Sequence, residues 1–436
     1  MRLLKQHSNG LILLLTIIEK NTKFNQFDKA MKTVRKAMKS GDVQVRGLSI
    51  AVLREMVIRY TKIDEIKEEA LRITHAAIKS RHAQEQYEGF ALYCALIGRD
   101  KEFNQFDELT QNIDLAMQSS DKDVQASGIW LLYKHVKRNP HFDAFKKAHA
   151  IAKIGMESSS RGMRCSTSAL LSILVRKEAR FSELPEVQRF AIAEVRSAMA
   201  TKVTTEEWQT PASFTNSVSL LSQLVDRDID FQKHEYASIQ QAALRGVEIA
   251  HAKAWANALG MLVRLVDRRM ATLSIDQLTT IALQAMKSKM PRVLTGGLHL
   301  LRIILQQEAT FVQFEAAEQA TLRCTEYDNT WVRRQALDVL IELLQKNKLQ
   351  NLTLAEHVAQ RSAHSSNDEE HRAGKELLHL LMRKKNHNVF VFGFLALAFF
   401  GLCYFLGSWL LRKIRNRRLR MMSKFGHKDW SKHDPS

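Results

Sequence analysis

The segments Phe24-Asn-Gln-Phe-Asp28 and Phe103-Asn-Gln-Phe-Asp107 carry the same five residues 79 positions apart. Two phenylalanines at this spacing recur in Phe142-Asp-Ala-Phe145 and in Phe311-Val-Gln-Phe314. Similar segments at regular distances are typical of proteins built from stacked structural repeats. We therefore expect these phenylalanine pairs to lie in the core between repeats and not to form a ligand site.

A second motif, Ala-Met-x-Ser, begins ten residues after the second phenylalanine in two of these segments. We take the position of its methionine as the reference residue of each repeat. Reference residues then fall at positions 38, 78, 117, 156, 247, 286 and 325, mostly 39 or 40 residues apart. The interval of 91 residues between positions 156 and 247 contains one more repeat. This repeat has an enlarged loop around 201–211, and its reference residue is Glu206.

The residues 12, 15 and 19 positions after each reference residue are apolar or aromatic at 23 of 24 places. On a helix these positions lie within about 60° of one another and form one stripe for burial. Each repeat is thus predicted to be two helices joined by a short polar turn. One such hairpin cannot bury its stripe alone, so the sequence predicts an all-α fold in which about eight hairpins stack into an α-solenoid over 1–382.

A pattern of Asp, Val, Arg and Leu is most complete in the last full repeat. The first repeat carries a similar pattern from Asp42 onward. In the last repeat these positions are Asp328, Val332, Arg333, Ala336 and Leu340. This pattern and the 39-residue spacing resemble HEAT-like repeats. The resemblance implies a curved scaffold that binds other macromolecules and has no catalytic activity of its own.

The composition agrees with a helical chain. The 436 residues include only 17 Gly and 5 Pro, too few for the turns of a large β-sheet protein. Hydrophobic residues make up 45%, which disfavours disorder. The four cysteines are far apart and form no Cys-x-x-Cys motif, which indicates a reducing compartment and no zinc site.

The segment 389–411 has 23 residues without a charge, about 34 Å of helix. We predict that it is a transmembrane helix, that 383–388 is a basic linker, and that 412–436 is a basic tail. A single-pass C-terminal anchor in the lipid bilayer would then hold the solenoid on the cytosolic side of a membrane that the sequence does not identify. The residues expected to contact anionic lipid headgroups are Arg412, Lys413, Arg415, Arg417, Arg418 and Arg420.

The net charge of +19 raises the question of nucleic acid. The tail after Leu411 accounts for +7 of it. The face of the second helices opposite the buried stripe, sampled 9, 13, 16 and 20 positions after each reference residue, carries only +2 in 32 positions. A phosphate backbone requires a denser row of Lys and Arg. A nucleic-acid-binding HEAT-like protein therefore stays as the alternative function.

We find no motif for a nucleotide, a metal or a nucleophilic triad, and we expect no cofactor, no metal and no catalytic residue. An enzyme on a helical scaffold has no supporting motif. The inner face is made largely of small residues, which either pack against the chain itself or form a groove for a partner protein. In the second case the anchors would be Tyr87, Trp130 and Tyr133, since exposed aromatic residues concentrate binding energy.

The predicted function is a membrane-anchored, non-enzymatic scaffold or tether for protein–protein interaction. Its partner is not identified by the sequence. Such an arrangement would also suit a protein that an intracellular bacterium delivers into a host cell.

Overall fold

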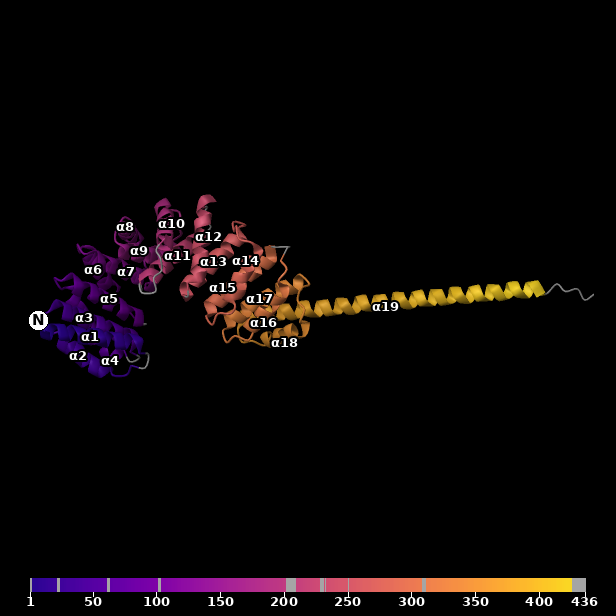
Figure 1. Cartoon of the computed structure of the whole chain (residues 1–436), viewed down its shortest axis with the longest axis horizontal. Helices are drawn as coiled ribbons and strands as arrows, with labels where there is room; N and C mark the ends of the chain where they lie inside the picture. Colours follow the sequence, from indigo (N-terminus) through magenta and orange to yellow (C-terminus); the bar gives the residue numbers. More distant parts are fainter. Residues whose placement is uncertain are drawn as a thin grey trace, which may run out of the picture. The chain divides into compact units, whose positions relative to one another are not determined.

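The computed structural model describes residues 2–21, 24–60, 63–100, 103–200, 209–227, 231, 233–249, 251–307 and 311–425. Within its helices, the side chains of 2–7, 209–211, 233–234, 386–398, 411 and 415–425 are not described. The described residues form helices and no β-strand, so the predicted all-α class is confirmed (Figure 1). The chain divides into two compact units, Met1–Gln307 and Glu308–Ser436.

The first unit contains helices α1 to α15. Their bounds are α1 Arg2–Lys20, α2 Phe27–Ala37, α3 Val43–Arg59, α4 Asp64–Ile78, α5 Ala83–Arg99, α6 Phe106–Met117, α7 Lys122–Arg138, α8 Phe145–Met156, α9 Arg161–Lys177, the 3₁₀ helix η1 Ala179–Phe181, α10 Pro185–Ala200, α11 Gln209–Asp226, α12 Lys233–Glu248, α13 Ala252–Asp267, α14 Ile275–Ala285 and α15 Pro291–Gln307. The second unit contains α16 Phe314–Cys324, α17 Thr330–Gln345, α18 Leu352–Ser362 and α19 Asp368–Phe425.

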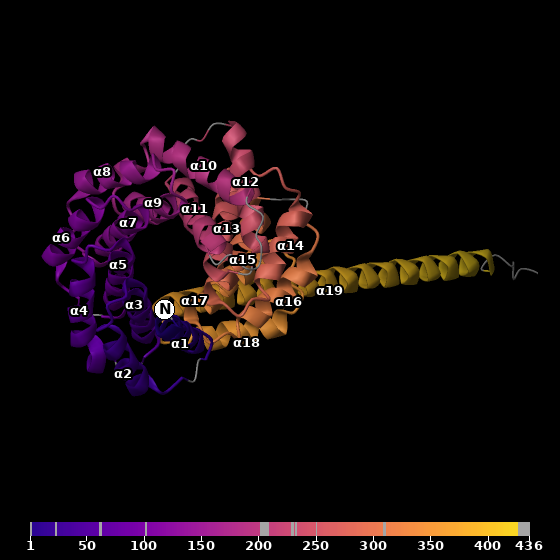
Figure 2. The ribbon, with the colours of Figure 1, turned by 60° about the vertical axis from the view of Figure 1, so that its left-hand side comes forward.

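Consecutive helices of the first unit form antiparallel hairpins, beginning with α2 and α3 and continuing to α14 and α15. The second helix of each hairpin also packs on the second helix of the next one, from α3 through α5, α7, α9, α11 and α13 to α15. In Figure 2 these second helices line the inner side of the first unit, and the even-numbered helices cover its outer side. This arrangement is consistent with the predicted α-solenoid.

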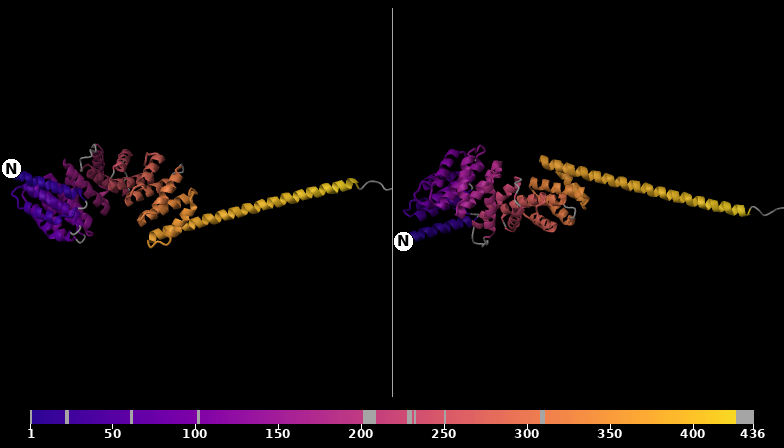
Figure 3. Two further views of the ribbon diagram at one scale, coloured as in Figure 1. Left: turned by 60° about the horizontal axis from the view of Figure 1, so that its bottom comes forward. Right: turned by 90° about the horizontal axis from the view of Figure 1, so that it is seen from above.

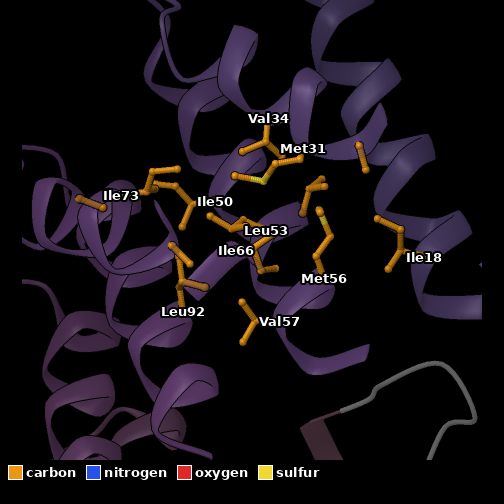
Figure 4. Close-up of a cluster of buried hydrophobic side chains, with 14 of the residues drawn as sticks. Ile18, Met31, Val34, Ile50, Leu53, Met56, Val57, Ile66, Ile73 and Leu92 are labelled. Carbon is orange, nitrogen blue, oxygen red and sulfur yellow. The ribbon is translucent and has the colours of Figure 1, made fainter. Parts of the chain in front are cut away.

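The stripe predicted 12, 15 and 19 positions after each reference residue is the core of the hairpins. All 24 of these residues are buried, and none is more than 4% exposed. Figure 4 shows the first repeat, where Ile50, Leu53 and Val57 pack with Met31 and other apolar side chains of the neighbouring helices. The single polar member, Ser168, is also buried. Its hydroxyl donates a hydrogen bond of 3.1 Å to the Arg164 carbonyl of its own helix, which satisfies the group without a partner outside.

The alanine of the Ala-Met-x-Ser motif lies where the two helices of a hairpin approach each other closely. A Cβ atom placed on Gly128 of α7 would lie 2.7 Å from the Cβ of Ala116 in α6. The same approach occurs between Gly89 and Ala77, at 2.8 Å. Only small residues allow this approach, which explains why alanine recurs just before the reference residue.

Each phenylalanine pair lies at the start of the first helix of a hairpin. Helices α2, α6, α8 and α16 all begin at the second phenylalanine of a pair, and none of these starts has a side-chain cap hydrogen bond. The two rings of each pair meet edge to face, with centroids 4.8–5.8 Å apart. Aromatic packing therefore sets these helix starts.

The second helices begin differently, with polar caps. The carboxylates of Asp42 and Asp121 accept hydrogen bonds from backbone N–H groups in the first turn of α3 and α7. In the last full repeat the cap of α17 is Asn329, one residue after the aspartate that the HEAT-like pattern selects. The pattern's arginine, Arg333, lies in the first turn of α17 and donates two hydrogen bonds of 2.7 and 2.8 Å to buried Glu370 of α19. It thereby links consecutive hairpins.

The C-terminal part of the prediction is wrong. Helix α19 runs without a break over 58 residues (Figure 3), but across the residues that the structure describes no helix is both long and apolar enough to cross a membrane. The side chains of 389–398 lie outside the described residues. The transmembrane helix, and the membrane localisation that rested on it, are corrected accordingly.

Candidate functional site

A hollow of about 380 Å³ opens on the inner face of the first unit, between helices α5, α7, α9 and α11. Residues from all four second helices contribute to its lining. They are Tyr87, Ala91, Cys94, Asp123, Ala126, Ser127, Trp130, Arg161, Gly162, Cys165, Ser166, Ala212 and Ser213. Most of these side chains are small, which is why the packed helices leave a space here.

Two of the three predicted anchors, Tyr87 and Trp130, line this hollow. The Tyr87 side chain is 37% exposed, and Trp130 is half-buried. The third anchor, Tyr133, lies one turn further along α7, where its ring stacks on Trp130 with centroids 4.8 Å apart and planes 29° apart. The structure thus brings the three residues together on one face, while their contact with a partner stays a prediction.

Two lysines accompany the aromatic pair on α7. The Nζ of Lys134 lies 5.8 Å from the centroid of the Trp130 ring, and the Nζ of Lys137 lies 5.8 Å from that of Tyr133. A cation at this distance is attracted to the face of an aromatic ring. Burial lowers the pKa of Lys134, and the charges of Lys137 and Arg138 lower it further. The C-terminal half of α7, next to the hollow, therefore carries both aromatic rings and cations.

The thiols of the hollow are poor nucleophiles. Burial raises the pKa of Cys94 to about 12, so its thiolate is rare at neutral pH. Burial also raises the pKa of Cys165, partly offset by a hydrogen bond of 3.4 Å from Asn216 Nδ2 to its sulfur. Burial likewise raises the pKa of the Tyr87 hydroxyl. These groups are suited to contact a ligand and not to attack one.

Sequence reasoning missed the charged residues at the N-terminal ends of the second helices. Asp123 and Arg161 line the hollow, and the Nη2 atom of Arg161 is buried without a hydrogen-bond partner among the described residues. They stand six and five positions after their reference residues, outside the four positions that were sampled. Extending the sampled face by one helical turn toward the N-terminus would have included them.

No group of three His, Cys, Asp or Glu side chains is placed to hold a metal ion within the described part of the chain. Of the six basic residues predicted after 411, Arg412 and Lys413 are exposed on α19. The side chains of Arg415, Arg417, Arg418 and Arg420 lie outside the described residues.

Comparison with known proteins shows no family for the chain. No family model matches it, and no curated protein matches its sequence. Among solved structures, one engineered protein is 11% identical, with a TM-score of 0.46 over 86% of this chain and 95% of that one. A second engineered protein is 10% identical, with a TM-score of 0.34 over 64% of this chain and 98% of that one. Similarity this low carries no argument, and the HEAT-like resemblance stays a prediction.

Proposed function

We propose that the chain is a non-enzymatic scaffold for protein–protein interaction and that a segment of a partner protein binds in the hollow between α5, α7, α9 and α11. The observation that carries the proposal is the hollow itself. It offers the half-exposed rings of Tyr87 and Trp130 beside a floor of small residues.

The size and lining of the hollow favour a side chain or short segment of a protein. Binding energy at protein interfaces is concentrated in a few Trp, Tyr and Arg residues, and all three types are present. The inner face is also the side on which second helices from many repeats come together, so a partner could contact several repeats at once (Figure 2). The thiols with raised pKa give no support to covalent chemistry.

Site-specific photocrosslinking in the cells that produce the protein tests this proposal. A benzophenone amino acid replaces Tyr133, which is next to the hollow. The matched control replaces Ile154 of α8, a 48% exposed apolar residue on a first helix. We expect irradiation to join a discrete protein to the Tyr133 position and not to the Ile154 position, and mass spectrometry of the crosslinked peptide to identify the bound segment.

A second variant controls for loss of folding. Adding Trp130→Ala to the chain labelled at position 133 should abolish the crosslink while the circular dichroism spectrum stays helical. Crosslinks of equal yield at both labelled positions, or no protein crosslink at position 133, would contradict the proposal.

A further inference from the structure

Helix α1 has the register of a second helix. It packs on α3, and its residues Leu11 and Ile18 are buried in the core of the first repeat. These two residues take the stripe positions that lie 12 and 19 residues after the reference residue in the later repeats. In the same register, Gly10, Leu13 and Ile17 correspond to positions 11, 14 and 18.

These three positions are covered in the later repeats. The residues at positions 14 and 18 are no more than 7% exposed in all eight repeats. At position 11, a Cβ placed on Gly89, Gly128 or Gly297 would lie 2.7–2.8 Å from the Cβ of an alanine in the first helix of the same hairpin. Positions 11 and 18 are about 20° apart around a helix, so this first helix lies over both.

The corresponding face of α1 is open. Leu13 is 62% exposed and Ile17 is 40% exposed. Among the described residues, no neighbouring helix comes within 4 Å of a Cβ placed on Gly10. A glycine destabilises the interior of a helix relative to alanine, and what it permits is the close approach of another backbone. Helix α1 therefore presents an interface for a first helix that no described helix covers.

A groove of about 310 Å³ continues this face onto α2. Its lining includes Leu14 and Ile17 of α1 and Lys29 and Thr33 of α2. Lys29 stands nine positions before the reference residue of the first repeat. It is exposed and forms no ion pair with any residue that the structure describes. An occupant of the groove would therefore meet an available cation.

In later repeats the side chain at the position of Lys29 pairs with the preceding first helix. Arg35 Nε of α2 lies 2.8 Å from Glu69 Oε1 of α4, and Lys147 Nζ of α8 lies 2.6 Å from Asp114 Oδ1 of α6. Arg35 and Asp114 each stand two positions before the alanine that precedes their reference residue. Lys29 is thus complementary to an acidic residue two positions before the small residue of an occupant.

We propose that the open face of α1, formed by Gly10, Leu13 and Ile17, binds an amphipathic helix of a partner protein. This helix places a small residue against Gly10, packs apolar side chains on Leu13 and Ile17, and presents a carboxylate to Lys29. An apolar helix face that lies in a groove is a common mode of peptide recognition. The site uses other helices than the hollow and does not depend on it.

A partner helix fits this face better than a second copy of α1. Two positions before Gly10 stands Ser8, so a second copy would offer no carboxylate at the place that Lys29 requires. By contrast, α6 of this chain has both features, with Asp114 two positions before Ala116. It therefore serves as a model of the occupant.

Fluorescence anisotropy of a labelled synthetic peptide of residues 103–120, which contains α6, tests the proposal against the full-length chain. We expect saturable binding that Gly10→Leu weakens at least about tenfold, because the new side chain fills the space for the alanine. Gly10 is exposed on a helix, so this variant should keep its circular dichroism spectrum. A peptide with Ala116→Leu should also fail to bind.

The ion pair is tested by charge reversal. Lys29→Glu should weaken binding about two- to fivefold, as is usual for an exposed pair. A peptide with Asp114→Lys should then bind the Lys29→Glu chain better than the wild-type chain. The matched control is Lys32→Glu, which makes the same change on an exposed residue of α2 outside the groove and should leave binding unchanged.

No binding of the peptide, or binding that Gly10→Leu leaves unchanged, would overturn the proposal. Light scattering of the full-length chain examines the other occupant. A dimer that Gly10→Leu converts to a monomer would assign the face to a second copy and would likewise overturn the proposal. Neither result bears on the hollow, because the crosslink at position 133 is measured separately.

Discussion

Two sets of aromatic residues in the same helices have opposite surroundings. Rings between consecutive repeats form the inter-repeat ladder, in which each ring contacts the next. Its members are Tyr93, Phe103, Phe106, His135, Phe142, Phe145 and Phe181. The inner-face cluster of Tyr87, Trp130 and Tyr133 has one stacked pair and adjoins a hollow. Rings packed between repeats therefore serve folding, whereas the partly exposed rings beside the hollow remain accessible to a ligand.

The largest expected effect comes from the ladder. Phe142 is 7% exposed and meets His135 and Phe145 edge to face, with centroids 5.2 and 5.3 Å away. Phe142→Ala should lower the free energy of unfolding by about 3–5 kcal/mol, because a cavity is left between two repeats. Urea denaturation followed by circular dichroism measures it. Phe142→Leu, which keeps most of the volume, should cost clearly less, and a loss below about 1 kcal/mol for Phe142→Ala would contradict the structural role of the ladder.

The next effect in size is a pH dependence of stability, which arises from His135 of the inter-repeat ladder. His135 stacks on Phe106 at 5.3 Å, and burial lowers its pKa, as do the charges of Lys147 and Lys177. The unfolded chain then takes up this proton near its ordinary pKa of about 6.5, before the folded chain does. The contribution to stability is complete above about pH 6.5 and is lost as the pH falls below it.

The control for this prediction is His135→Phe, which keeps a stacked ring and cannot titrate. Comparing the urea midpoints of the two chains between about pH 7.5 and about pH 5 isolates the histidine from all other groups. If the two midpoints fall in parallel, His135 has no depressed pKa in the folded chain.

A smaller effect on stability is expected from the inner-face cluster. Trp130→Ala removes a ring stacked on Tyr133 and should cost less unfolding free energy than Phe142→Ala, because part of the ring is exposed. The same urea titration measures it. A loss as large as that of Phe142→Ala would place Trp130 in the core and would remove the contrast between the two sets.

The sequence predicts the ladder better than the inner-face cluster for a physical reason. Packing between neighbours repeats every 39 residues, so Phe142 and Phe145 are visible as a motif, and so is the buried stripe. The hollow combines residues far apart in the chain, such as Tyr87 and Arg161, and no periodic pattern contains that information. The transmembrane prediction for 389–411 rested on apolar composition, and no helix among the described residues is long and apolar enough to cross a membrane.

The smallest expected effect leaves stability unchanged and measures how open the hollow is. In the wild-type chain, iodoacetamide at about pH 8 should alkylate the exposed Cys403 first, then Cys165, and the buried Cys94 and Cys324 much more slowly. Cys165 lines the hollow and is partly exposed, whereas Cys94 is 7% exposed and burial raises its pKa to about 12. Peptide mapping by mass spectrometry gives these rates. A partner segment bound in the hollow should slow alkylation at Cys165 and leave Cys403 unchanged, whereas equal rates at Cys165 and Cys94 would mean that the hollow is closed to small reagents.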